Sequence, residues 1–311
     1  MAGWVLGQAG LKTKTRKGLA ALILGANMPD LDVFLGHAPW DPLAIHRGFT
    51  HGLVGGVLLM PPILAGLLWL LDRWQLSRGA IFKSGLPMHF GWLVALSYLG
   101  TLTHPYLDLL TTYSVQLFSP FSSRWYHADA LFIIDIWVWL LLAVAIGVSK
   151  RRERQGREWR RLPQAAIAIV LAYIGLNLAI SQSAEAAVRH WSAAPPAQSI
   201  FASPRPVAFW RRDLVWREGD CYRRSSYDPL SGGMGPVSAC EPTNMGNPLV
   251  REAVARDPRL QKFLKWSVLP QADVVRSRCT AHVAIGDARY GEGRRSRLAR
   301  ETTVPTGAAG C

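Results

Sequence analysis

The chain has 311 residues, half of them hydrophobic, and its mean hydropathy is positive at +0.11. Thirteen tryptophans add to this apolar character, so the composition excludes an ordinary soluble domain and indicates a membrane protein. The formal net charge of +14 would suit nucleic acid, but no nucleic-acid module accompanies it, and we expect no nucleic-acid partner.

Four apolar segments have the length of a membrane span, at residues 52–71, 86–103, 131–148 and 164–180. An earlier apolar run at 18–28 is too short to cross alone, so it joins upstream residues or forms a short re-entrant helix. We therefore predict an all-α transmembrane bundle of about four to five membrane helices.

Basic residues follow a pattern that fixes the orientation of this bundle. If the Arg-rich loop at 150–161 is cytoplasmic, alternation places residues 12–17 and 72–85 on the same side, and both segments are basic as well. Residues 29–51, residues 104–130 and everything after residue 181 then lie on the outer side of the membrane.

The composition divides the chain into three parts. Residues 1–181 form the predicted membrane domain, residues 182–206 a proline-containing linker, and residues 207–311 an extracytoplasmic domain of α+β or irregular structure. This last part holds all four cysteines, which fits disulfide bonds on the outer side, with unpaired thiols as the alternative: Cys221, Cys240, Cys279 and Cys311.

Two polar clusters precede the first predicted span. An extended segment would place Asp30 and Asp32 on one side, where their carboxylates can bind a divalent ion, although a turn that caps a helix would also explain Asp30. His51 stands where the span begins, and neutral imidazole is the commonest metal ligand. A helix cap at Thr50 is the alternative, because it would make His51 merely the first helical residue.

Two neighbours of His51 are candidates for substrate binding. Arg47 carries a planar guanidinium group that matches a phosphate or a carboxylate, and His46 stands beside it. Anchorage to lipid headgroups is the alternative role for Arg47.

The third and fourth clusters flank later spans. His104 and Asp108 are four residues apart at a helix end, so their side chains share one face and can reach the same ion, although a lone membrane histidine is more often structural. Asp135 lies about one turn inside an apolar helix, where it must be paired or functional, and a hydrogen bond to a ligating histidine is the expected role. Asp30, Asp129 and Asp135 are the candidate catalytic carboxylates.

Together these residues predict one metal site at the outer rim of the bundle, with Asp32, His51, His104 and Asp108 as ligands. Imidazole and carboxylate ligands without cysteine suit zinc, which we expect first, with manganese or iron as alternatives. Such an ion lowers the pKa of a bound water to about 7 and polarises a phosphoryl or acyl oxygen, so the pattern favours hydrolysis.

The order of the motifs along the chain is a further observation. They cover roughly the first 180 residues: Ala26-Asn27-Met28-Pro29-Asp30-Leu31-Asp32, Arg47-Gly48-Phe49-Thr50-His51, Thr103-His104-Pro105-Tyr106-Leu107-Asp108, Thr111-Thr112-Tyr113-Ser114, Pro120-Phe121-Ser122 and Asp129-Ala130-Leu131-Phe132-Ile133-Ile134-Asp135. This series resembles the membrane-bound metal-dependent hydrolase family, inner-membrane proteins of which some are LexA-regulated. The resemblance implies a bacterial inner-membrane protein, a metal-dependent hydrolase with a poorly defined substrate, and a distant link to helical zinc-dependent phospholipase C and nuclease folds. In the inner membrane, the orientation given by the basic loops makes the chain a multi-pass protein with a periplasmic C-terminal domain.

One feature departs from that family, whose members usually begin with a Thr-His pair. This chain begins Met1-Ala2-Gly3-Trp4, so either an upstream start supplies the histidine or this member lacks one ligand. The resulting hypotheses are a hydrolase of a phosphoester or lipid-like substrate, a metal-binding sensor or scaffold without catalysis, and, third, a transporter. Membrane lipids and an unidentified small-molecule or lipid substrate are the expected partners, and the oligomeric state stays open.

Overall fold

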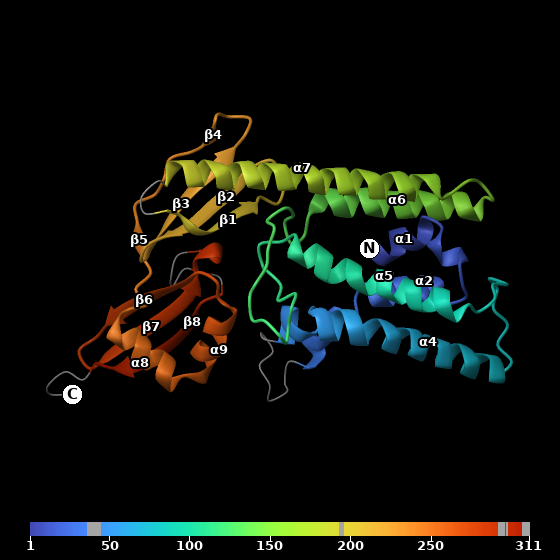
Figure 1. Cartoon of the computed structure of the whole chain (residues 1–311), viewed down its shortest axis with the longest axis horizontal. Helices are drawn as coiled ribbons and strands as arrows, with labels where there is room; N and C mark the ends of the chain where they lie inside the picture. Colours follow the sequence, from blue (N-terminus) through green and yellow to red (C-terminus); the bar gives the residue numbers. More distant parts are fainter. Residues whose placement is uncertain (36–44, 193–195, 292–295, 297, 307–311) are drawn as a thin grey trace. The chain divides into compact units, whose positions relative to one another are not determined.

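The computed structural model describes residues 1–35, 45–192, 196–291, 296 and 298–306. The chain divides into two compact units, an N-terminal unit, Met1–Leu178, and a C-terminal unit, Ala179–Cys311. The N-terminal unit is helical and the C-terminal unit contains β-sheets, which confirms the predicted change of fold class along the chain (Figure 1).

The N-terminal unit is built from long helices and short helical turns. Its elements are α1 (Ala2–Gln8), η1 (Leu11–Thr13), α2 (Gly18–Gly25), η2 (Pro29–Leu35), η3 (Ile45–Phe49), η4 (Leu53–Leu59), α4 (Met60–Ser77), α5 (Phe90–Leu109), α6 (Ile136–Arg154) and the first part of α7 (Arg161–Trp191). Helices α2, α4 and α5 share one apolar core around Leu22, Leu64 and Leu96, whereas α1, α6 and α7 share a second around Val5 and Ile146.

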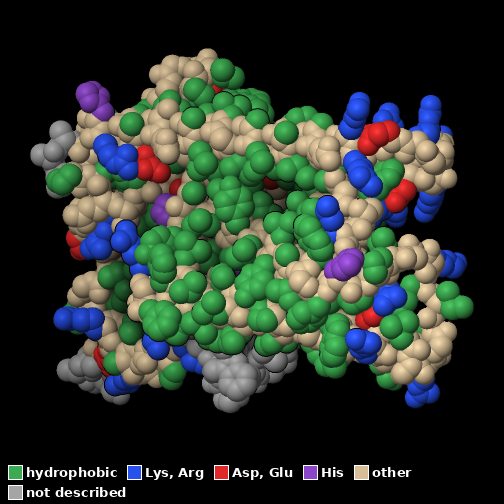
Figure 2. All heavy atoms as spheres, turned by 45° about the vertical axis from the view of Figure 1, so that its right-hand side comes forward, with side chains coloured by type: hydrophobic (Ala, Val, Ile, Leu, Met, Phe, Trp, Pro, Cys, Tyr) green, Lys and Arg blue, Asp and Glu red, His purple; other side chains and the backbone are tan. Residues whose placement is uncertain are grey.

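Two helical segments of the described chain are long and apolar enough to cross a membrane. They are Leu53–Ser77, which joins η4 to α4, and Arg161–Trp191, which is α7. Exposed apolar side chains cover much of the molecular face shown in Figure 2, as a lipid-facing surface requires. These observations support a membrane protein, but they give two spans where the sequence predicted four to five.

The other two predicted spans fall short for local reasons. The helix expected at 131–148 begins only at Ile136, because the Asp135 side chain accepts hydrogen bonds from the backbone N–H groups of Trp137 and Val138 and so caps α6. The last turns of α6 carry several arginines. The helix expected at 86–103 begins at Phe90 and carries polar residues of the candidate site in its last turns.

The basic segments lie at one end of the N-terminal unit. The C-terminal ends of α4 and α6 and the N-terminal ends of α5 and α7 point the same way in Figure 1. The basic segment at residues 12–17 forms ion pairs with the helices at this end. Lys12 Nζ lies 2.5 Å from Glu153 on α6, and Arg16 Nε lies 2.8 Å from Asp72 on α4. This grouping agrees with the predicted arrangement of the basic loops, while the side of the membrane they face stays a prediction.

Glycines allow α2 and α5 to approach closely. A Cβ atom built at Gly100 of α5 would lie 2.8 Å from the carbonyl oxygen of Leu22 and 3.0 Å from that of Ala21. At Gly91, in the same helix, a Cβ would meet nothing within 4 Å. Small residues at such crossings are typical of helices that pack in membranes.

We expect Gly100→Ala to destabilise the N-terminal unit by about 1–3 kcal/mol, because the α2 backbone must move to make room. Gly91→Ala is the matched control and should stabilise it by about 0.5–1 kcal/mol, since alanine loses less backbone entropy in a helix. Thermal unfolding of the detergent-purified chain would show a lower midpoint for the first variant and an equal or higher one for the second. Equal shifts in both would contradict the close crossing.

The described residues of the C-terminal unit form two antiparallel sheets, the last part of α7 and two further helices. The first sheet comprises β1 (Gln198–Pro204), β2 (Arg212–Glu218), β3 (Cys221–Asp228), β4 (Gly233–Met234) and β5 (Glu241–Pro242), and the second comprises β6 (Pro270–Arg276), β7 (Thr280–Asp287) and β8 (Arg300–Pro305). Helices α8 (Pro248–Arg256) and α9 (Pro258–Trp266) and the turn η5 (Ala288–Tyr290) complete it.

Two regular elements occupy described parts of the stretch predicted as a linker, residues 182–206. Helix α7 continues to Trp191, and β1 begins at Gln198. Ala184 and Val188 on this part of α7 are fully buried against the first sheet, so an apolar helix face outweighs the proline content of the segment.

A disulfide joins Cys221 to Cys240, with 5.5 Å between their Cα atoms, which confirms the expected disulfide chemistry for this pair. Cys311 lies outside the described residues.

Candidate metal centre

Two short helical turns and the end of α5 bring the candidate ligands together at the end of the N-terminal unit remote from its basic loops. Asp30 lies in the 3₁₀ turn η2, His51 follows the π-helical turn η3, and His104 lies in the last turns of α5. About fourteen residues separate His104 from the start of α5, which is roughly 20 Å along the helix axis. The cluster and the basic segments are therefore at opposite ends.

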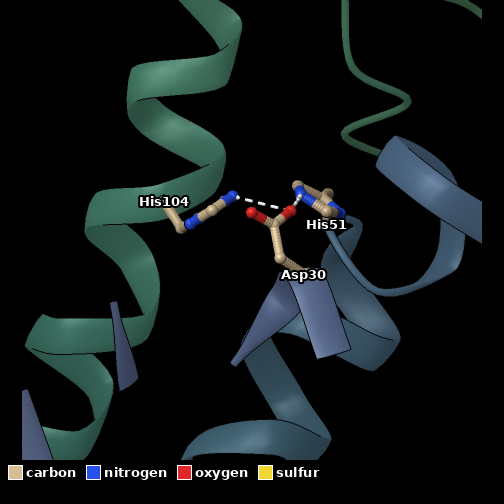
Figure 3. Close-up of side chains that lie close together, drawn as sticks. All are labelled: Asp30, His51 and His104. Atoms are coloured by element: carbon tan, nitrogen blue, oxygen red, sulfur yellow. Dashed lines mark ion pairs between the residues drawn. The ribbon is translucent and has the colours of Figure 1, made fainter. Parts of the chain in front are cut away.

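The side chains of Asp30, His51 and His104 point toward a common centre (Figure 3). Asp30 Oδ1 lies 3.1 Å from His104 Nε2 and 3.5 Å from His51 Nε2, and one ligand atom from each residue lies within 4.8 Å of the other two. The two imidazole rings meet edge to face with their centroids 5.1 Å apart. The structure thus confines two imidazoles and a carboxylate to the space that one ion would fill.

Burial around the cluster is uneven. The His51 side chain is fully buried, whereas 48% of the Asp30 side chain is exposed, so the cluster opens to its surroundings at Asp30. Burial alone would raise the pKa of the Asp30 carboxyl, but the hydrogen bonds and charges of His104 and His51 hold that pKa well below its usual range. Asp30 is accordingly an anion in the presence of both rings.

Hydrogen-bond donors and acceptors in the cluster fit a cation. His104 Nδ1 lies 2.8 Å from the backbone carbonyl oxygen of Ala26, which can only accept, so Nδ1 carries a proton. In the neutral ring Nε2 then holds a lone pair, and it faces the Asp30 carboxylate at 3.1 Å. Two acceptors that close need a positive charge between them, which a second ring proton or a metal ion would supply.

The spacing fits a tetrahedral ion as well. Zinc bonds of roughly 2.0–2.2 Å place neighbouring ligand atoms on the order of 3.3–3.6 Å apart in a tetrahedron. The 3.5 Å separation between Asp30 Oδ1 and His51 Nε2 agrees with this spacing, and the 3.1 Å separation from His104 Nε2 is slightly shorter. Three protein ligands would leave a fourth position for water or substrate, as in catalytic zinc sites.

Asp108 adjoins the cluster and is held by Arg47. Its Oδ2 lies 3.3 Å from His51 Nε2 and 3.7 Å from His104 Nε2, while its Oδ1 lies 3.4 Å from the Arg47 guanidinium group. The guanidinium group also donates to Thr111 Oγ1 at 3.4 Å and lies over the Tyr113 ring. Asp108 is therefore close to both imidazoles without belonging to the three-residue group.

The backbone conformation of Arg47 is consistent with a functional site in this region. Arg47 has a φ of 61°, a left-handed conformation that is unfavourable for a residue with a Cβ, and its carbonyl oxygen accepts from the backbone N–H of Gln116 at 2.9 Å. Such conformations persist where surrounding contacts enforce them, which is common at functional sites.

Asp32 does not belong to the three-residue group. An extended segment was expected to put it beside Asp30, but η2 is a 3₁₀ helix, in which residues two apart differ by roughly 120° around the axis. Asp32 instead accepts a hydrogen bond from Thr50 at 2.5 Å. The geometry thus favours Asp30 over Asp32 as the ligand.

The remaining predicted site residues lie elsewhere. Asp129 is fully buried and pairs with His127, whose Nδ1 is 3.0 Å from its Oδ1. Asp135 caps α6 and accepts a hydrogen bond from the Tyr173 hydroxyl at 2.9 Å. The side chain of His46 lies outside the described residues. Catalytic roles for Asp129 and Asp135, and substrate binding by His46, stay predictions.

The sequence pattern does not predict that Thr50, Thr111 and Tyr113 contact residues next to the candidate ligands. Thr50 was considered only as a helix cap, and the other two only as part of a motif. Their contacts with Asp32 and Arg47 depend on how η2, η3 and the end of α5 meet, which no local pattern reveals.

The apolar helices and the His/Asp cluster define the class of the chain, a membrane protein with a polar site at one end of its helical unit. The family model described as YdjM inner membrane protein matches residues 1–184, and the chain belongs to this family. Comparison with the curated proteins and with the solved structures finds no match. The family's description names a membrane and no reaction, so it confirms the predicted inner-membrane class and leaves metal dependence and hydrolysis as predictions.

Proposed function

We propose that the N-terminal unit is a metal-dependent hydrolase whose ion is held by Asp30, His51 and His104. The observation that carries the proposal is the convergence of three ligand atoms within 4.8 Å of one another, from segments far apart in the sequence. Two imidazoles and one carboxylate suit zinc first, with manganese and iron as alternatives.

A divalent ion in such a site lowers the pKa of a bound water to about 7 and polarises a phosphoryl or acyl oxygen. Asp108 is the candidate general base, because it lies beside both imidazoles and Arg47 keeps one of its oxygens in place. The Arg47 guanidinium group has five N–H donors, and Asp108 and Thr111 take two of them. The same group can therefore bind an anionic substrate oxygen.

A phosphoester or lipid-like substrate suits the surroundings of the cluster. Exposed apolar side chains stand next to the ligands in sequence: Leu31 follows Asp30, and Tyr106 is two residues after His104. The polar headgroup of a lipid-like substrate could bind at the carboxylate and imidazole cluster. The apolar part of that substrate could then remain in contact with apolar side chains.

For the topology we propose a multi-pass protein of the inner membrane with the cluster and the C-terminal unit on the periplasmic side. Two observations support it: the basic segments gather at the end opposite the cluster, and the C-terminal unit contains the Cys221–Cys240 disulfide. Fusions of a reporter active only in the periplasm, placed after residue 311 and within the loop at 155–160, should be active and inactive respectively. The reverse pattern would overturn this orientation.

The function is tested on full-length protein purified in detergent. Metal analysis after mild chelation and reloading with zinc should give bound zinc, and the loaded protein should hydrolyse bis(p-nitrophenyl) phosphate or a short-chain phospholipid faster than the chelated protein. Bound zinc without hydrolysis of any phosphodiester or ester would favour the sensor or scaffold. A protein that takes up no zinc, manganese or iron would overturn the proposal.

A further inference from the structure

Three basic segments lie together at the end of the N-terminal unit opposite the metal cluster, and we call this surface the basic end. It comprises residues 12–17, 72–85 and 150–161, which contain fourteen Lys and Arg residues and three acidic ones. Lys and Arg side chains gather at this end in Figure 2, with few acidic side chains among them. The basic end therefore carries a large excess of positive charge.

The three acidic side chains of the basic end are engaged within the protein. Asp72 and Glu153 form the ion pairs with Arg16 and Lys12 described above. Glu158 accepts hydrogen bonds from backbone N–H groups at the start of α7. In the described part of the chain, no carboxylate forms an ion pair with the other basic side chains of this surface. Their counter-ions must therefore come from outside the chain.

Aromatic rings accompany many of these cations. Lys14 Nζ lies 5.0 Å from the ring centroid of Trp92, and the guanidinium carbon of Arg78 lies 5.7 Å from that of Trp74. The same kind of contact recurs around the basic end: Lys12 and Arg160 with Trp159, Arg16 and Lys17 with Phe82, Arg73 with Trp69, and Lys150 with Trp4. A ring face attracts a cation, and tryptophan is enriched where a membrane protein meets the lipid headgroups.

Both candidate membrane spans have one end at this surface. The span Leu53–Ser77 ends here, and the span Arg161–Trp191 begins here. Lys and Arg side chains at the end of a span extend toward the headgroups while their apolar stems stay in the lipid. Ile81, in the loop after α4, is 95% exposed, as suits an apolar side chain that enters lipid. The cations of the basic end therefore lie at the level of the lipid phosphates.

We propose that the basic end binds anionic phospholipids, whose phosphates are the missing counter-ions, and that the Lys14–Trp92 and Arg78–Trp74 pairs contact them. A zwitterionic headgroup carries its own ammonium group, which cancels the charge of its phosphate, so it neutralises the surface less well. Nucleic acid carries the same phosphates, but exposed apolar side chains such as Ile81 favour a lipid. The proposal rests on the membrane class of the chain and not on hydrolysis.

Lipid titration of the full-length protein in neutral detergent tests the preference. Native mass spectrometry measures binding of dioleoyl phosphatidylglycerol, which is anionic, and of dioleoyl phosphatidylcholine, which has the same chains and no net charge. We expect the anionic lipid to bind at least about fivefold more tightly, since each Lys or Arg near an anionic surface contributes about that factor. Equal affinities, or binding of a short DNA oligonucleotide without binding of phosphatidylglycerol, would overturn the proposal.

The double variant Lys14→Gln, Arg78→Gln tests the named pairs. Both side chains are exposed, so their replacement should leave the fold intact. We expect the affinity for phosphatidylglycerol to fall roughly 5–30-fold and that for phosphatidylcholine to stay the same. The double variant Lys14→Arg, Arg78→Lys keeps both charges and should keep the wild-type preference. A loss of affinity in this second variant as large as in the first would show that charge is not the cause.

The matched control removes two exposed positive charges from the C-terminal unit, in the double variant Arg251→Gln, Arg276→Gln. It should bind phosphatidylglycerol like the wild type. Wild-type affinity in the Lys14→Gln, Arg78→Gln variant, or an equal loss in the control, would overturn the assignment to the basic end. Zinc uptake should be the same in all these proteins, so a failure of the proposed metal centre is seen separately.

Discussion

Replacing His104 with alanine is expected to abolish stoichiometric zinc binding by the purified protein. His104 supplies one of three proposed ligands, and the hydrogen bond between its other ring nitrogen and the Ala26 carbonyl holds the ring in place. Loss of a ligand should cost more than the roughly 10–100-fold expected for a supporting residue. Metal analysis and chelator competition measure the loss, and phosphodiester hydrolysis should fall with it.

His127→Ala is the control for this experiment. His127 lies in the same unit and also pairs with an aspartate, but it is outside the three-residue group. Its replacement should leave zinc affinity unchanged. If His104→Ala retains wild-type affinity, or if both variants lose zinc equally, the three residues do not form the metal centre.

The sequence predicts the parts of the site that depend on local periodicity. His104 and Asp108 share a helix face because they are four residues apart, and α5 is helical there as expected. That His51 belongs with them follows from one simple argument, that buried imidazoles and carboxylates need partners. The structure places Asp30, His51 and His104 around one point, in agreement with the convergence that the sequence indicates.

The remainder depends on backbone detail and on contacts between elements. The choice between Asp30 and Asp32 turns on whether η2 is extended or 3₁₀, and a seven-residue stretch after a proline fits either. Asp135 interrupts an apolar run in the sequence, and the structure shows that the helix begins just after Asp135, which caps it. Apolar length alone overstated the number of membrane spans, since polar residues in the last turns of α5 and charged residues in the last turns of α6 make these helices less apolar than the predicted segments.

The largest effect on stability is expected in the C-terminal unit, at the ion pair between Asp287 and Arg289. Both side chains are fully buried, and Asp287 also accepts from the Ser267 hydroxyl at 2.7 Å and the Val268 backbone N–H at 2.9 Å. Asp287→Asn would remove the negative charge that faces the buried Arg289 guanidinium group. Breaking such a pair from one side typically costs about 3–5 kcal/mol.

A surface ion pair in the same unit gives the matched control. Arg205 and Asp213 lie 2.6 Å apart, but their side chains are 41% and 59% exposed. Water screens a pair of this kind, so Asp213→Asn should change stability by about 0–1 kcal/mol. Hydrogen exchange of peptides from β6 and β7, measured in the full-length protein, reports the stability of the C-terminal unit separately from that of the N-terminal unit. Similar exchange rates in the two variants would show that burial of the Asp287 pair contributes nothing.

The effect of Asp287→Asn should depend on pH. Burial alone would raise the pKa of Asp287, but the Arg289 charge and the hydrogen bonds from Arg289 and Ser267 hold it below its usual value. A carboxylate with a depressed pKa in the folded state stabilises the fold fully above the unfolded pKa, about 3.9, and loses that contribution as pH falls through the folded value. The difference between wild type and Asp287→Asn should therefore be constant from pH 7 to about pH 5 and shrink below about pH 4. A difference that grows on acidification would mean that Asp287 is protonated in the native fold at neutral pH.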